Sequence, residues 1–247
     1  MINLAWSEWL AGNSDTAARL AREAVAQSRE IDHPYTLAYA ICMGAAVFQC
    51  RREAETVLSM VNEVISIAKE RDYRYWIAWG TCLQGWAKAQ LGSPELGIEA
   101  LVDGLKEYRD TGSTLFVPHI LCMTAESQCL IGSHAEARRN LELAAEIESD
   151  NRIYFYAAET QRLLATVESE LGETESSIIH FQKALDLAKA QKAGSFELRI
   201  ALSIMQNPLA DSIVPDAKKI LAFALNNLDE GQGDKDQHTA RDLVISE

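Results

Sequence analysis

The sequence is poor in the two residues that most strongly disfavour helix interiors. Its 247 residues include only 13 glycines and 5 prolines, which cost a helix interior about 1 and 3 kcal/mol each, respectively. Alanine, leucine and glutamate, which favour helices, are frequent instead. The composition therefore predicts a mostly helical chain. A hydrophobic content of 48% excludes disorder for most of it, because disordered chains lack the apolar residues that build a core.

Basic residues are outnumbered as well. The chain has 23 Lys and Arg against 36 Asp and Glu, a formal net charge of −13. Nucleic-acid backbones and anionic membrane surfaces attract clustered Lys and Arg, so we expect neither nucleic acid nor a membrane as a partner. No apolar run reaches the length of a membrane-spanning helix, and the best candidate, residues 35–48, indicates a buried helix.

Signals for secretion and for disulfide formation are also missing. The first residues lack the basic and uninterrupted apolar regions of a signal peptide. The cysteines are odd in number, at five, and contain no CxxC pair, which disfavours a disulfide framework. We therefore expect a cytoplasmic protein.

What the chain does contain is a pattern with a period of forty residues. Cys42, Cys82 and Cys122 have this spacing, and several series of small or apolar residues share it. Another series occupies a turn position and holds Gly12, Arg52, Gly92, Gly132, Gly172 and Ser212. Six copies in register cover nearly the whole chain, which indicates a repeat array.

One copy has the features of a helical hairpin. Residues 76–90 are apolar with helical periodicity, and a second helix is expected over 95–108. Between them, Gly92 suits the left-handed position that ends a helix. Ser93 is a candidate N-cap and Pro94 suits the first helical position. The glycines in these helices predict that the two members of a pair approach closely.

A hairpin alone cannot cover its apolar face, so the copies must stack. We predict an all-α protein, an α-α superhelix (solenoid) of about six antiparallel hairpins. The order of small and large residues within a copy resembles the tetratricopeptide (TPR) pattern, as in Gly85, Gly92, Gly97, Leu101 and Gly104. HEAT and armadillo arrays, whose periods are also near forty, are the less favoured alternative.

We expect a single solenoid over residues 1–247. The repeat boundaries fall at approximately 1–32, 33–72, 73–112, 113–152, 153–192 and 193–247. The last copy departs from the pattern, since Pro208 ends its first helix and Pro215 restarts the second. An atypical terminal copy is expected to cap the array. The tail over 226–237 predicts a loop, followed by one last helical turn at 239–245.

Several segments resemble a particular group of TPR arrays. These segments are residues 33–40, 76–80, 194–199 and 231–236. They are similar to the C-terminal TPR region of large bacterial signalling proteins that carry a class III adenylate/guanylate cyclase domain and an ATPase domain. The resemblance implies a role in bacterial signal transduction, with upstream cyclase and ATPase domains as potential partners. No GxxxxGK[ST] phosphate loop occurs in the chain, so those activities do not carry over.

In TPR arrays the first helix of each pair lines a concave groove, and the forty-residue register selects candidates for that face. They are Trp6, Tyr39, Cys42, Trp79, Cys82, Trp86, His119, Cys122, Glu126, Glu159, Arg162 and Arg199. The first half of the groove is then aromatic and sulfur-lined, and the two arginines could hold a ligand carboxylate. The alternative is that the aromatic residues fill the core. Alanine at Trp79 and Trp86 would abolish binding in the first case and folding in the second.

The same residues give little reason to expect metal or catalysis. Neighbouring first helices lie about 8–10 Å apart, too far for cysteines of the forty-residue series to share a zinc ion. His119 and Cys122 share a helix face, but no acidic residue is placed to orient the histidine. We expect no metal, no cofactor and no enzymatic activity.

The sequence therefore predicts a non-catalytic protein-interaction or regulatory sensor module that holds a protein or peptide ligand in its groove. Two alternatives stay open. One is a standalone adaptor, and the other is a solenoid that binds a small apolar ligand or a peptide signal.

Overall fold

The computed structural model describes residues 1–31, 33–207, 217–228 and 230–245, and within them every regular element is a helix. The thirteen described helices are α1 (Ile2–Ala11), α2 (Ser14–Glu30), α3 (Pro34–Cys50), α4 (Ala54–Glu70), α5 (Arg74–Gln90), α6 (Pro94–Asp110), α7 (Val117–Cys129), α8 (His134–Asn151), α9 (Ala157–Glu170), α10 (Thr174–Gln191), α11 (Gly194–Gln206), α13 (Ala217–Asn226) and α14 (Lys235–Ile245).

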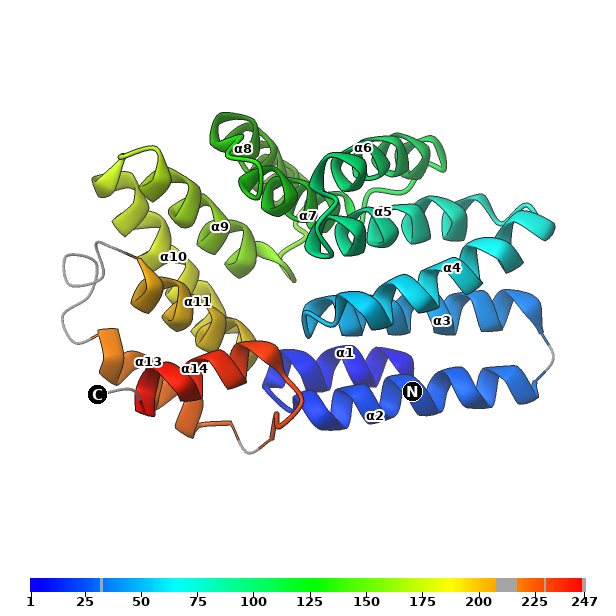
Figure 1. The fold of residues 1–247 in the computed structure, drawn as a ribbon, viewed down its shortest axis with the longest axis horizontal. Helices are drawn as coiled ribbons and strands as arrows, with labels where there is room; N and C mark the ends of the chain where they lie inside the picture. The colour runs from blue at the N-terminus through cyan, green and yellow to red at the C-terminus, as the bar shows by residue number, and fades with distance from the viewer. Residues whose placement is uncertain (32, 208–216, 229, 246–247) are drawn as a thin grey trace.

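Consecutive helices pack as pairs, and the pairs stack. Each odd-numbered helix from α1 to α9 contacts the even-numbered helix that follows it, and also the next odd-numbered helix along the chain. The first helices therefore form a continuous row, and α2, α6 and α8 lie on its outer side (Figure 1). This arrangement confirms the all-α, TPR-like helical solenoid. None of the described helices is long and apolar enough to cross a membrane.

The turns within the pairs follow the predicted chemistry. Gly92 has φ +93°. Its N–H donates a hydrogen bond to the carbonyl oxygen of Ala89, and the Ser93 N–H donates one to the carbonyl oxygen of Lys88. These two bonds satisfy carbonyls that the helix end leaves without partners. Pro94 occupies the first turn of α6, as predicted. Ser93 precedes the helix, but its hydroxyl makes no capping hydrogen bond.

Glycines allow α5 and α6 to pack with their backbones nearly in contact. A Cβ atom on Gly97 would lie 2.5 Å from the carbonyl oxygen of Gly85 and 2.7 Å from the Cβ of Ala89. A Cβ on Gly104 would lie 2.7 Å from the sulfur of Cys82. The close approach predicted for this pair is therefore confirmed.

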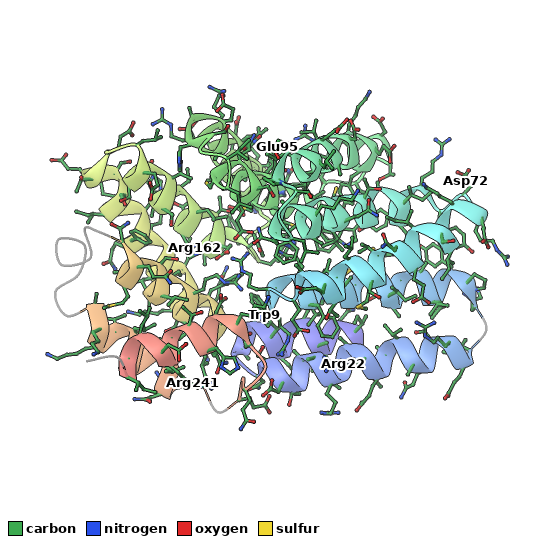
Figure 2. All side chains as sticks on the ribbon, viewed as in Figure 1. Trp9, Arg22, Asp72, Glu95, Arg162 and Arg241 are labelled. Carbon is green, nitrogen blue, oxygen red and sulfur yellow. The ribbon has the colours of Figure 1, made fainter. Side chains whose placement is uncertain are left out.

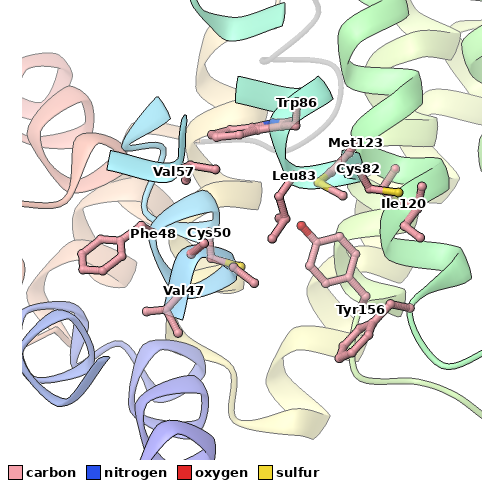
Figure 3. Packing of buried hydrophobic residues seen from close by; sticks show 14 of the residues in the cluster. Val47, Phe48, Cys50, Val57, Cys82, Leu83, Trp86, Ile120, Met123 and Tyr156 are labelled. Carbon is pink, nitrogen blue, oxygen red and sulfur yellow. The ribbon is translucent and has the colours of Figure 1, made fainter. Parts of the chain in front are cut away.

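Large side chains fill the space between the pairs. One continuous apolar cluster extends from α1 to α11, and a smaller cluster joins α11, α13 and α14. Figure 3 shows part of the larger cluster, to which Phe48 and Val57 of the second pair, Trp86 of the third and Tyr156 just before α9 all contribute. The core is therefore shared by all repeats, as the stacking argument requires.

The first and last repeats meet, so that the array closes on itself (Figure 1). Helix α1 packs against α11. The Ser195 hydroxyl donates to the Trp9 carbonyl oxygen at 2.5 Å, and the Trp9 and Phe196 rings meet edge to face with centroids 5.3 Å apart. The guanidinium of Arg199 lies over the Trp9 ring at 5.2 Å. This closure was not part of the sequence prediction.

The C-terminal helix is longer than predicted. Instead of one turn over 239–245, α14 begins at Lys235. The reason is a cap, because a carboxylate oxygen of Asp234 accepts hydrogen bonds from the N–H groups of Asp236 and Gln237. Such a cap satisfies amides that the first helical turn leaves without partners. Pro208 and Pro215 lie outside the described residues.

The backbone contact between α5 and α6 can be tested with Gly97→Ala. The added Cβ has no room, so the variant should lose about 1–3 kcal/mol of unfolding free energy although alanine favours helix more than glycine does. Gly44→Ala is the matched control, because the tightest contact of its Cβ would be the flexible end of Met60, at 3.1 Å, and its next neighbour, Val25, would be at an ordinary 3.6 Å. Urea unfolding followed by circular dichroism measures both. Equal stability of the two variants would contradict the packing argument.

Candidate functional site

Six charged residues from distant parts of the chain meet inside the closed array. This central ion cluster consists of Arg52, Glu126, Glu159, Arg162, Arg199 and Asp236. They come from the turn between α3 and α4 and from helices α7, α9, α11 and α14. Figure 2 shows Arg162 and Trp9 near the middle of the molecule, whereas Asp72 lies at its margin.

Glu159 is the centre of this cluster and is only 1% exposed. Its two oxygens accept hydrogen bonds from Nε and Nη2 of Arg162, both at 2.8 Å. Nη1 of Arg199 lies 3.3 Å away and Nη2 of Arg52 lies 3.6 Å away. Burial raises the pKa of this carboxyl, but the three guanidinium charges lower the pKa by more than burial raises it, so the net shift is downward. The carboxylate therefore stays ionised in the interior.

Arg52 enters the cluster from a strained backbone position. It stands where four of the other repeats have a turn glycine and keeps the left-handed conformation, with φ +64°. A residue with a Cβ pays about 1–2 kcal/mol for this conformation. In return its guanidinium forms an ion pair with Glu126, whose second oxygen accepts a hydrogen bond from Trp86 Nε1 at 2.9 Å. Asp72, Arg152 and Lys192 also have a positive φ, so the ion pair distinguishes Arg52 and the backbone conformation does not.

Arg199 connects the cluster to both ends of the chain. Its Nε donates to Oδ2 of Asp236 at 2.6 Å, and its Nη2 donates to the carbonyl oxygen of Cys50 at 2.5 Å. Burial would lower the pKa of the guanidinium, but the charges of Asp236 and Glu159 raise it more. The side chain is therefore a permanent cation, held between α3, α9 and α14.

An aromatic group lies beside the charges. His119 is buried, stacks on Tyr156 with centroids 4.1 Å apart and places Nε2 2.9 Å from Oε1 of Gln49. Trp79 and Trp6 meet the same imidazole edge to face. Burial lowers the pKa of His119 to about 3, so the imidazole is neutral at physiological pH.

A cavity of about 500 Å³ opens next to the central ion cluster. The wall has charged groups from Arg52, Glu55, Glu126, Arg162 and Lys235, and Leu130 and Thr166 are among the other lining residues. A volume of this size suits a small ligand or a few peptide side chains. A hollow of about 650 Å³ also exists, but side chains of α10 alone line it and none belongs to the cluster.

The structure divides the twelve predicted groove residues into groups. Glu126, Glu159, Arg162 and Arg199 come together in the central ion cluster. Trp6, Trp79 and His119 belong to the aromatic group, and Trp86 joins the cluster through Glu126. Tyr39 lies apart, donating to Oδ1 of Asn3 at 2.8 Å. The remaining three are Cys42, Cys82 and Cys122, which are buried free thiols.

Two of the predicted aromatic residues do not line an open surface. Trp79 and Trp86 are both 0% exposed and pack in the core. Alanine at either position is therefore expected to lower stability, and a test of ligand binding has to use residues that line the cavity. Burial raises the pKa of the Cys122 thiol, and a protonated thiol is a poor nucleophile. Within the described residues, no group of three or more His, Cys, Asp or Glu could hold a metal ion.

Sequence reasoning missed two members of the cluster. Arg52 was noticed only as a departure from the glycine series, although a cation at that turn position was itself a signal. Asp236 lay in a segment predicted to be a loop. The repeat register could not select it, because α14 follows the last hairpin and has no counterpart in the other copies.

No family model matches this sequence, and no curated protein matches it either. Among solved structures, a Rap protein complexed with competence and sporulation factor is similar, with a TM-score of 0.70 and 11% sequence identity. The similarity covers 98% of this chain and 72% of the Rap chain. At this identity it shows a shared fold, the TPR-like helical array.

A second buried carboxyl, that of Glu148 in α8, lies against α9 and makes the stability of the interior depend on pH. Glu148 is 3% exposed and accepts a hydrogen bond from the Thr160 hydroxyl. Burial raises its pKa to about 7, despite that bond and the charge of Lys183. An unfolded carboxyl titrates near 4.3, so the native state loses stability as pH rises from there to about 7, and loses no more above it.

Glu148→Gln removes this titration and keeps the acceptor for Thr160. At pH 8 the variant should be more stable than the native chain by about 1–3 kcal/mol. At pH 5.5 this gain in unfolding free energy should be smaller by about 1–2 kcal/mol. Urea unfolding at the two pH values measures the difference. A gain that does not depend on pH would show that Glu148 is ionised in the folded state at both.

Proposed function

We propose that this chain is a non-catalytic regulatory module that binds a peptide or a peptide segment of a protein inside its closed helical array. The observation that carries the proposal is the central ion cluster beside a cavity of about 500 Å³. Charged side chains inside a protein cost stability unless they are paired. The six charged residues beside the cavity therefore support the proposal that this interior surface binds a ligand.

The composition of the cavity wall supports a peptide ligand. Arginine and lysine side chains there can pair with carboxylates, Glu126 can accept from N–H groups, and leucine and valine side chains can cover an apolar residue. A peptide offers all three kinds of group. A small apolar ligand, the alternative from sequence, would have to lie against charged groups that already pair with one another, which matches the wall less well than a ligand with polar groups of its own.

The similar solved structure is consistent with this proposal. It is a Rap protein complexed with competence and sporulation factor, so a chain of this fold holds a bound factor in that case. We propose the same type of role here, that of a sensor whose interior takes up a signal.

The wider setting rests on the sequence resemblance. We propose that the module acts in bacterial signal transduction in the cytoplasm, as the C-terminal arm of a cyclase–ATPase signalling protein. A standalone adaptor is the alternative. Detection of an upstream cyclase or ATPase reading frame joined to this one would favour the first proposal.

Peptide selection on the immobilised full chain tests the function. A displayed library of random peptides is enriched on the protein, and selected peptides are synthesised and measured by fluorescence anisotropy. Thr166→Phe places a ring in the cavity that Thr166 lines. It should weaken binding of the selected peptides by about tenfold or more, which corresponds to about 1.4 kcal/mol.

Ser59→Phe is the matched control, because Ser59 is an exposed residue of α4 outside the cavity. It should leave the affinities unchanged. Circular dichroism verifies that both variants fold. If no peptide is enriched, or if selected peptides bind Thr166→Phe as tightly as the native chain, the cavity is not the binding site.

A further inference from the structure

The segment Glu230–Asp236, which we call the C-terminal strap, joins the two ends of the array. Its sequence is Glu-Gly-Gln-Gly-Asp-Lys-Asp, with three acidic residues and no apolar side chain. It leads into α14 and passes the start of α2, and its last residue reaches α11 (Figure 1). Its side chains and backbone make polar contacts with α2 and α11, and each of these can be matched to a group that another peptide could supply.

The first acidic residue of the strap binds at the start of α2. Oε2 of Glu230 accepts the Thr16 N–H at 2.8 Å, and Oε1 accepts the Thr16 hydroxyl at 2.7 Å. The amides of a first helical turn have no partner within the helix. A carboxylate is favoured there both by the free N–H groups and by the helix dipole.

The strap backbone is bound as well. The carboxylate of Asp15 accepts the N–H groups of Gly231, Gln232 and Gly233, at 3.0, 2.9 and 3.3 Å. Gly231 has φ +116°, and a Cβ on Gly233 would lie 2.7 Å from Nη2 of Arg51. The glycines therefore let the strap backbone lie directly against the start of α2 and the side chain of Arg51.

The other two acidic residues reach into the interior. Oδ2 of Asp234 accepts the Ser14 hydroxyl at 2.6 Å, and Oδ2 of Asp236 accepts Nε of Arg199 at 2.6 Å. Asp236 is the strap's contribution to the central ion cluster. The other five members are three arginines and two glutamates, so without Asp236 the cluster has a net charge of +1.

We propose that the C-terminal strap is a built-in occupant of an acidic-peptide site, and that an incoming peptide with a similar spacing of carboxylates displaces it. The ligand class is a peptide of the form acidic-x-x-x-acidic-x-acidic with small residues after its first position. The inference rests on the proposed function and assigns its ligand. It also assigns a regulation, because the strap competes with the ligand at the high effective concentration of a tethered segment.

The test uses the full chain and a labelled peptide of residues 230–236 with blocked ends. Replacement of Glu230, Asp234 and Asp236 by their amides weakens the strap in cis while it leaves the receiving residues in place. This triple variant should bind the labelled peptide at least about tenfold more tightly than the native chain does, because tethered competition is removed. Binding should weaken as salt is raised, since the contacts are ionic.

Three controls define the result. A labelled peptide with the same three amide replacements should not bind. Glu146→Gln, which removes an exposed carboxylate from α8, should leave the affinity of the native chain unchanged. The single variant Asp236→Asn is nearly isosteric and replaces the triple variant if the latter does not fold. It should also bind the labelled peptide more tightly than the native chain does, by a smaller factor than the triple variant.

A folded triple variant, or a folded Asp236→Asn variant, that binds the labelled peptide no better than the native chain overturns the inference. The proposed function is judged separately by the peptide selection. If the selected peptides lack acidic residues and still lose affinity for the Thr166→Phe variant, the proposed function stands and the inference about the strap is wrong.

Discussion

The buried carboxylate of Glu159 is the interaction on which the closed array depends. It faces arginines from the second, fifth and sixth repeats, and one of them, Arg199, also holds Asp236 and stacks on Trp9. Glu126 and Asp236 each pair with one of these arginines, whereas Glu159 faces all three, and an unpaired buried charge would cost several kcal/mol. The same carboxylate therefore brings together repeats that lie more than one hundred residues apart in the chain.

Closure changes what the interior of such an array can do. In an open solenoid the first helices present a surface to solvent. Here Trp9 packs against Phe196 of the last repeat, and Trp79 packs against Phe116 and His119 in the core. The groups left for recognition are the ionic ones beside the cavity. Polar contacts can exchange partners with little loss of packing, so the interior can be specific and still open to a competing ligand.

The forty-residue register predicted the parts of the fold that are local. Gly92 and Pro94 determine the turn between α5 and α6 through their own backbone preferences, and Gly97 records a close helix contact. The contact of α1 with α11 could not be predicted, since it depends on rotations accumulated over six repeats. Trp79 and Trp86 were correctly placed on the inner helices, but sequence alone could not decide whether that face was lined or filled. Asp236 required knowledge of where α14 packs.

Amide hydrogen exchange on Glu159→Gln tests most directly whether one carboxylate holds the array closed. The substitution keeps the shape of the side chain and removes its charge. We predict that α1, α11 and α14 lose protection together, because all three depend on the arginines that Glu159 balances, while α5 and α6 keep theirs. Faster exchange confined to α9 would contradict this account, and would show that the repeats meet without help from the central ion cluster.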